Sequence, residues 1–182
     1  INIVSAGFDP ISKLDEIPNN PKQRYKLMTK DMPAGGELSL DMMYRTCGTQ
    51  LNIDYNSEQD FIKKFKIVNS VVPISIALFA NSSIVEKKNS GYLSYRSKVW
   101  QNTSRGGLPK LFFEELNFEK YAEFVMNFPI LFIQEGNNYI SGKKYIFKDF
   151  MNGKIKEIRN RLPNENDLST HLSTIFTENR LK

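Results

Sequence analysis

The most regular pattern of apolar and polar residues lies between Leu38 and Tyr55. Successive side chains of an extended chain point to opposite faces, so this stretch predicts two distinct faces from Tyr44 onward. One face is small and polar, and the other is largely apolar from Cys47 onward. Their residues are, respectively, Tyr44, Thr46, Gly48, Gln50, Asn52, Asp54 and Arg45, Cys47, Thr49, Leu51, Ile53, Tyr55. We therefore predict a strand over residues 44–55.

Two interpretations of this strand remain open. It is either a plain half-buried antiparallel strand with its polar face in water, or part of a sheet that is open to a ligand on that face. Gln50 and Asn52 favour the second interpretation, because neighbouring amides without an adjacent charge supply both donors and acceptors to a polar ligand.

Helical periodicity and capping signals predict several helices. We expect a helix over 22–31, and a longer one that Ser57 caps and that ends near Asn81. Phe61, Phe65, Val68, Val71 and Val72 recur at helical spacing in the longer helix, and Pro73 should kink or split it. Further helices are predicted from Asn117 to about residue 127, over 147–151, and from 164–167 onward.

Short strands complete the predicted elements. Residues 1–7 and 174–181 have strand character, and the runs 130–134 and 139–140 flank Gly136-Asn137-Asn138, which is a hairpin signal. Helices and strands mixed without strict alternation predict an α+β fold, with an antiparallel sheet flanked by helices.

Composition limits the class of protein. The 182 residues are 40% hydrophobic and 25% charged, which is typical of a globular protein with a real core. The net charge of +5 is spread over scattered lysines, so nucleic acid is not an expected partner. The longest apolar run, 71–80, carries Pro73 and is too short to cross a membrane.

The single Cys excludes an intrachain disulfide framework and predicts a cytoplasmic location, where thiols stay reduced. His171 is the only histidine, which argues against a metal site built from Cys and His. The chain starts at Ile1 as if within a strand and stops after an apolar stretch. We therefore expect both ends to be truncated and the chain to be an internal segment of a longer protein.

Arg24, Arg96 and Trp100 lie near Gly or Pro breaks. An arginine can hold a carboxylate or phosphate through two parallel hydrogen bonds, which suits amino-acid or nucleotide ligands. Each arginine taken singly is more often a surface charge, and a lone Trp is more often part of a core.

Other candidates carry weaker signals. Arg105-Gly106-Gly107 could approach a phosphate, although it is not a P-loop. Asp167 and His171 could form an acid–base pair, but an Asp that caps the helix and a half-buried His explain the same spacing. Cys47 in mid-strand is usually a small buried hydrophobe.

Several phrases of the sequence resemble one family, in its order and at about its spacing across nearly the whole chain. The phrases are GFDPISKLDEIPNNPKQRYKLMTK, LSLDMMYRTCGTQLNIDYNSEQDFIKKFK, ALFANSS, GYLSYRSKVW and THLSTIFTENRLK. They resemble glutamate–cysteine ligase of the plant and proteobacterial class. The resemblance implies the central part of a single catalytic domain, covering residues 1–182, with a curved antiparallel sheet similar to that of glutamine synthetase.

The resemblance also implies ATP-dependent ligation. ATP phosphorylates the γ-carboxylate of glutamate, and the cysteine amine attacks the acyl phosphate to give γ-glutamylcysteine, the first step of glutathione synthesis. Mg²⁺ is the implied cofactor, and glutamate, cysteine and ATP are the implied small-molecule partners. The carboxylate ligands of the metal are expected largely outside this segment, so the isolated chain should be inactive.

Site residues follow from the same resemblance. Arg24 and Arg96 match arginines expected to hold substrate carboxylates, and are the implied catalytic pair. Trp100 is expected to wall the pocket. The family's inward-facing strand corresponds to Thr46, Gln50 and Asn52, which are expected to contact substrate or Mg-nucleotide.

The chain departs from the family pattern at several positions. Gly48 and Thr49 stand where the family usually has Thr and Val, and Leu131 stands where it has a tyrosine near the cysteine pocket. Ser83 replaces a proline, and 177–179 replace Pro-Glu-Val. A related ligase with another acceptor amine, or a segment that only binds an amino acid or nucleotide, therefore remains an alternative.

Overall fold

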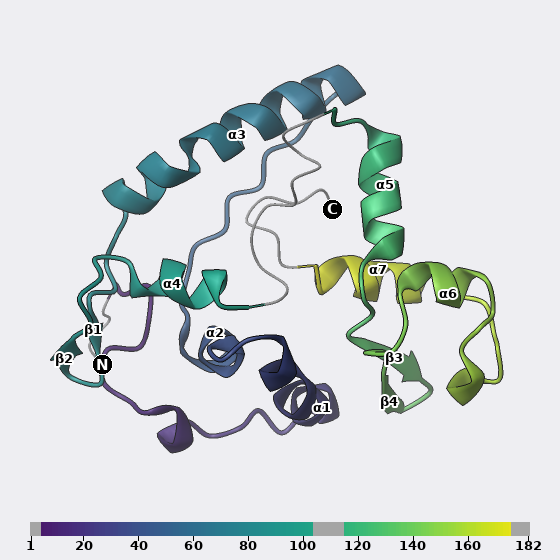
Figure 1. The fold of residues 1–182 in the computed structure, drawn as a ribbon, viewed down its shortest axis with the longest axis horizontal. Coiled ribbons are helices and arrows are strands. Elements are labelled where there is room, and N and C mark those ends of the chain that lie inside the picture. The colour runs from purple at the N-terminus through teal and green to yellow at the C-terminus, as the bar shows by residue number, and fades with distance from the viewer. Residues whose placement is uncertain (1–4, 104–114, 176–182) are drawn as a thin grey trace. The chain divides into compact units, whose positions relative to one another are not determined.

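The computed structural model describes residues 5–103 and 115–175, and Figure 1 shows their fold. These residues divide into two compact units. Unit 1 contains residues 5–18 and 33–103, and unit 2 contains residues 19–32 and 115–175. The short turn η2 (Met32–Gly35) lies at a boundary between the units along the chain. Each unit is described by itself.

Unit 1 is mostly helical. Its elements are η1 (Leu14–Glu16), α2 (Ser39–Arg45), α3 (Glu58–Leu78), β1 (Ile84–Val85), β2 (Lys88–Asn89) and α4 (Tyr95–Gln101). Its core includes Phe8 and Val99, which are fully buried, and the Phe8 ring meets Tyr95 edge-on at 5.1 Å. The hairpin β1–β2 pairs Ile84 with Asn89 and Val85 with Lys88. α2 packs on α4 and on η1.

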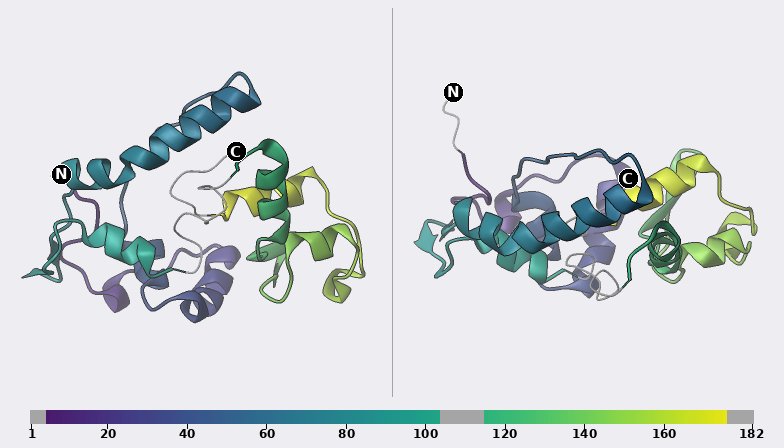
Figure 2. Two further views of the ribbon diagram at one scale, coloured as in Figure 1. Left: turned by 45° about the horizontal axis from the view of Figure 1, so that its top comes forward. Right: turned by 90° about the horizontal axis from the view of Figure 1, so that it is seen from above.

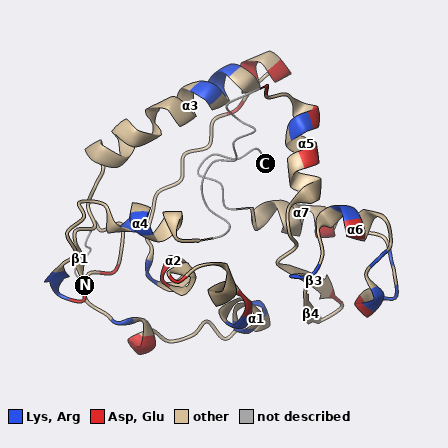
Figure 3. Ribbon diagram, viewed as in Figure 1, with Lys and Arg blue, Asp and Glu red and all other residues tan. Residues whose placement is uncertain are grey.

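α3 begins where the capping signal predicts, because the Ser57 hydroxyl accepts a hydrogen bond from the backbone N–H of Asp60 at 3.1 Å. Of the two effects predicted for Pro73, the split does not occur, since the helix continues to Leu78 (Figure 2), and the kink stays a prediction. Only Phe61 and Phe65 of its predicted inner face are buried. Its charged residues gather in the first turns, and residues 67–78 carry none (Figure 3).

The predicted strand over residues 44–55 is wrong. Residues up to Arg45 belong to α2, and only Thr46 forms a bridge, antiparallel to Phe8. Within the described ranges no strand pairs with residues 47–55. The face that was predicted to be buried is exposed to solvent: Leu51 is 83% and Ile53 is 51% exposed. Alternation is necessary for a half-buried strand, but a strand also needs a hydrogen-bonded neighbour and a layer to cover it.

Unit 2 contains a second hairpin. Its elements are α1 (Gln23–Asp31), α5 (Phe118–Asn127), β3 (Phe132–Glu135), β4 (Asn138–Ser141), α6 (Phe147–Met151), η4 (Lys156–Ile158) and α7 (Glu165–Ser173). The strands pair antiparallel from Phe132–Ser141 to Glu135–Asn138, and Gly136 in the turn has φ +58°. Its core includes a cluster of Ile130, Ile133, Phe147, Phe150, Ile155 and Ile158.

Local signals placed the elements of unit 2 well. The side chain of Asn117 accepts a hydrogen bond from Lys120 N–H at 2.8 Å and starts α5, as predicted. The hairpin and α6 also lie where the sequence predicts them. α1 packs along β4, where the Ser141 hydroxyl donates to Asp31 at 2.5 Å.

Helices combined with small antiparallel sheets confirm the α+β class. The described residues hold two separate two-stranded hairpins, β1–β2 and β3–β4, rather than one extended sheet. The predicted strands 1–7 and 174–181 lie mostly outside the described residues. Of their described ends, Gly7 accepts a hydrogen bond from Cys47 N–H, and Thr174 ends α7.

Candidate functional site

Arg96 is held at the start of α4 by contacts from two other segments. Its backbone N–H donates to the Ser82 hydroxyl at 3.1 Å, and its Nε–H donates to the Cys47 carbonyl at 2.9 Å. Its guanidinium carbon lies 5.6 Å from the centre of the Trp100 ring, one helical turn further along α4. The structure therefore brings together two predicted site residues, Arg96 and Trp100, and places them beside the segment that starts at Thr46.

The polar residues of that segment have different surroundings. Thr46 ends α2, and its hydroxyl donates to the Met42 carbonyl at 2.6 Å, so it is engaged with the helix that it terminates. Gln50 donates to Asn52 at 2.8 Å on an exposed part of the chain. The two amides thus share a side, as the alternation predicts, although no sheet supports them.

Arg24 lies in the other unit. It is half-buried near the start of α1, with its guanidinium carbon 5.3 Å from the Tyr25 ring centre. Its convergence with Arg96 on one substrate stays a prediction. The Arg105-Gly106-Gly107 loop lies outside the described residues.

The sequence reasoning missed Arg45, which it placed on a strand face. Arg45 is 4% exposed, and its Nη1 pairs with Asp41 at 2.9 Å and with Glu86 at 3.3 Å. Its guanidinium carbon lies 4.6 Å from the Phe8 ring centre. The spacing of four between Asp41 and Arg45 could have indicated a helical ion pair.

The positive charge of Arg45 reaches one further carboxylate. Burial acts to raise the pKa of Asp9, but backbone hydrogen bonds from Ser12 and Ile11, with the charge of Arg45, bring that pKa below its usual value. Both N–H groups donate to Oδ1 of Asp9, at 3.0 and 2.8 Å. These contacts fix the turn next to the Phe8–Thr46 bridge.

Asp167 and His171 have structural roles. Asp167 forms a capping box with Asn164 at the start of α7, and both oxygens of its carboxylate accept from Arg161. His171 is 3% exposed, lies within hydrogen-bond distance of the Val125 carbonyl at 2.8 Å and stacks on Phe147. A helix-capping Asp and a buried His, rather than an acid–base pair, account for both residues.

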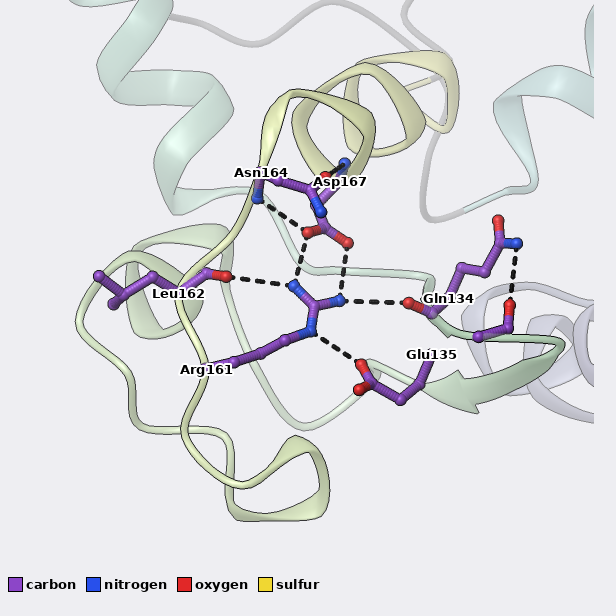
Figure 4. Close-up of polar contacts among 7 residues, drawn as sticks. Gln134, Glu135, Arg161, Leu162, Asn164 and Asp167 are labelled. Carbon is purple, nitrogen blue, oxygen red and sulfur yellow. Dashed lines mark hydrogen bonds and ion pairs between the residues drawn. The ribbon is translucent and has the colours of Figure 1, made fainter.

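Arg161 is a second residue that the sequence reasoning missed. It joins β3 to the start of α7 (Figure 4), since Nε donates to Glu135 and Nη2 donates to the Gln134 carbonyl as well as to Asp167. The hydrogen bond to Asp167 raises the pKa of Arg161, so the guanidinium stays charged. A bidentate arginine of this kind orders unit 2 rather than binding a ligand.

Metal-ligating side chains do not cluster in the described part of the chain. There, no three His, Cys, Asp or Glu side chains come together in a way that could hold a metal ion. The residues that the structure describes therefore do not by themselves fit a Mg²⁺ site.

Among residues 5–103 and 115–175, no helix combines the length and the apolar character that spanning a membrane requires.

Comparison with known proteins covers the whole chain. Residues 1–182 match the family model described as glutamate-cysteine ligase family 2. Glutamate–cysteine ligase A of Oryza sativa subsp. japonica is 43% identical, and the glutamate–cysteine ligases of Nicotiana tabacum and Arabidopsis thaliana are 44% and 42% identical. Each match covers 100% of this chain but only 38%, 35% and 35% of the relative, respectively. The chain thus spans little more than a third of these relatives' length.

The comparison also corrects one prediction. The expected cytoplasmic location is wrong, because all three of these relatives are named as chloroplastic proteins. A single Cys indicated only a reducing compartment and could not distinguish the cytoplasm from another one. The match over all 182 residues, at an identity above 40%, shows that the chain belongs to the glutamate–cysteine ligase family.

Proposed function

We propose that this chain is the central part of a catalytic domain that joins the γ-carboxylate of glutamate to the amine of cysteine, using ATP. The observation that carries the proposal is the match of the whole chain to relatives named glutamate–cysteine ligase. The reaction forms a γ-glutamyl phosphate, and the cysteine amine displaces its phosphate to give γ-glutamylcysteine. This is the first step of glutathione synthesis.

Arg96 is the residue best placed to bind glutamate. It is half-buried, and its Nε–H and backbone N–H are both tied to the protein, so little side-chain entropy remains to be lost on binding. An arginine held in this way aligns a carboxylate through charge-assisted hydrogen bonds. Trp100 beside it covers one side of the bound amino acid.

The remaining predicted residues have supporting roles in this proposal. Arg24 holds a second substrate carboxylate, and the amides of Gln50 and Asn52 contact substrate or nucleotide. The exposure of both amides is compatible with that role. Thr46 orients the segment that follows it through the hydrogen bond from its hydroxyl to the Met42 carbonyl, and it contributes to the wall of the proposed glutamate site. A curved antiparallel sheet similar to that of glutamine synthetase is proposed to support these residues in the full-length protein.

Mg²⁺ belongs to the proposed reaction, where it would neutralise the transferring phosphoryl group. The described residues do not provide its ligands, and we assign no step of this chain to the metal. The residues described here act on the amino-acid substrates: they bind glutamate and hold its γ-carboxylate in a fixed place.

The full-length protein tests the proposal directly. ADP release is measured with ATP, Mg²⁺ and glutamate, in the presence and absence of cysteine, and γ-glutamylcysteine is identified by mass spectrometry. We expect product formation to depend on cysteine. Release that requires another amine would support a ligase with a different acceptor. No release with any amine would overturn the proposal in favour of a binding segment.

A further inference from the structure

Ser82 joins the connection that follows α3 to the start of α4. It lies between α3 and β1, is 3% exposed, and its hydroxyl oxygen accepts the hydrogen bond from Arg96 N–H at 3.1 Å. Its backbone N–H donates to the Leu93 carbonyl and its carbonyl accepts from Tyr95 N–H, both at 3.2 Å. One buried residue thus makes three hydrogen bonds to residues 93–96, where the chain enters α4.

The first turn of α4 depends on Ser82 for its cap. The N–H groups in the first turn of a helix have no acceptor within the helix, and a side-chain oxygen commonly supplies one. Ser94 occupies the capping position, but its side chain makes no capping hydrogen bond, and its hydroxyl instead lies 2.8 Å from that of Ser97. α4 has only seven residues, too few for a helix to be stable by itself. The position of Arg96 is therefore set from outside its own helix.

Hydrogen bonds also link Ser82 to the other anchor of Arg96. Cys47 N–H donates to the Gly7 carbonyl at 3.0 Å, and Gly7 N–H donates at 3.4 Å to the carbonyl of Asn81, the residue next to Ser82. Arg96 closes this ring, since its N–H donates to Ser82 and its Nε–H donates to the Cys47 carbonyl at 2.9 Å. The backbone and the side chain of the arginine are thus fixed to one hydrogen-bonded frame. Removal of the Ser82 hydroxyl would open the ring at the backbone of Arg96.

We propose that Ser82 is a positioning residue, whose hydroxyl fixes the backbone of Arg96 so that the guanidinium meets a substrate carboxylate in the correct place. The inference rests on the proposed function, since it takes Arg96 as the glutamate ligand. Ser82 itself touches no substrate and acts only through Arg96. The carboxylate class of ligand follows from the guanidinium. Ser82 lies within ALFANSS, one of the phrases that resemble the family, so the pattern that gives Arg96 its role also contains this serine.

Substitutions of Ser82 in the full-length protein isolate the hydroxyl. Ser82→Ala leaves the Arg96 N–H without this acceptor, and we expect the KM for glutamate to rise about fivefold while the KM for ATP stays unchanged. Thr keeps a hydroxyl and Val, of nearly the same shape, does not. Ser82→Thr should therefore have the KM of the wild type, and Ser82→Val that of Ser82→Ala. Ser83→Ala is the matched control: it removes a hydroxyl from the next residue, whose carbonyl accepts from Ser90 N–H, and should leave the KM for glutamate unchanged.

Arg96→Ala distinguishes positioning from helix capping alone. That variant keeps the backbone N–H of residue 96, so Ser82→Ala should lower its thermal midpoint by the same amount as in the wild type. The effect of Ser82→Ala on the KM for glutamate should vanish, because the guanidinium that it misplaces is absent, whereas independent effects would multiply. An effect on this KM that persists without the guanidinium would overturn the inference.

The outcomes separate this inference from the proposed function. An unchanged KM for glutamate in Arg96→Ala would refute the role of Arg96 in the proposed function, and this inference with it. A raised KM in Arg96→Ala with an unchanged KM in Ser82→Ala would refute only the role of Ser82, as would equal KM values in Ser82→Thr and Ser82→Val. If neither Ser82→Ala nor Ser82→Val folds, the hydroxyl is required for folding itself, and the inference is overturned.

Discussion

Arg45 is buried, although arginine is rarely removed from solvent. Its Nη1 carries both ion pairs, while Nε and Nη2 have no hydrogen-bond partner among the described residues. The face of the Phe8 ring offers partial compensation for the guanidinium charge. Such a residue depends on its carboxylate partner Asp41, which is itself buried and depends on Arg45 in turn.

Replacing Arg45 should therefore cost more than replacing the whole pair. We expect Arg45→Met to lower the free energy of unfolding by about 3–5 kcal/mol, because Asp41 is left charged and buried. The double variant Asp41→Leu/Arg45→Met should recover most of that loss. Urea denaturation of the full-length protein measures both. Equal losses in the single and double variants would show that packing on Phe8, rather than the ion pair, determines the effect.

Asp9 gives unit 1 a dependence on pH. Its pKa in the folded protein is below the reference value of 3.8, so its contribution to stability is present above that value and is lost as the pH falls through the folded pKa. Asp9→Asn keeps an acceptor for Ser12 and Ile11 but cannot ionise. We expect the thermal midpoint of the wild type to exceed that of Asp9→Asn near pH 7, and the difference to shrink below about pH 4. A difference that is constant from pH 7 to pH 3 would contradict this account.

Three local signals were predicted correctly, and the strand over residues 44–55, which needs a pairing neighbour, was not. Ser57, Asn117 and the turn at Gly136 each act through a hydrogen bond or φ angle within a few residues, which the sequence contains. The stretch 44–55 has the right period for a strand, but period alone does not supply a neighbouring strand. The ion pair from Asp41 to Arg45 carried the competing helical signal.

Capping by Ser57 can be tested within one helix. Ser57→Ala should lower the free energy of unfolding by about 1 kcal/mol, because the Asp60 N–H loses its acceptor. Ser70 is the matched control: it is exposed in the same helix, and its hydroxyl donates back to the Lys66 carbonyl. Ser70→Ala should change the stability by less than about 0.5 kcal/mol, since alanine is the better helix former. Equal effects at both positions in chemical denaturation would show that the cap contributes nothing specific.

For the molecule as a whole, the sequence suggested candidate site residues, whose role stays a prediction, and it did not indicate which of them the fold brings together. Arg96 and Trp100 share α4, so their proximity follows from helical spacing. The contact from Arg96 to Cys47 joins residues far apart in sequence, and only the folded chain could show it. Arg24 lies in unit 2, and its match to the family remains the reason to include it.

The second half of α3 presents an exposed apolar surface. The second half of α3 lacks charge, and Ile67, Val71, Ile74 and Leu78 recur on it at helical spacing while being 53%, 42%, 60% and 73% exposed. Apolar side chains that are contiguous and exposed bind hydrophobic probes and promote association. We define these four residues as the α3 apolar stripe.

Introducing charge into the α3 apolar stripe should change the surface and leave the fold intact. Ile74→Lys is expected to reduce the fluorescence of a bound hydrophobic dye and the self-association of the 182-residue chain, because a charge interrupts the stripe. Its free energy of unfolding should change by less than about 0.5 kcal/mol, as for other exposed sites. Asn137→Lys, in the exposed turn between β3 and β4 rather than on α3, should leave dye binding unchanged. A loss of about 2–5 kcal/mol in Ile74→Lys, as for a core residue, would instead show that this face is packed in solution.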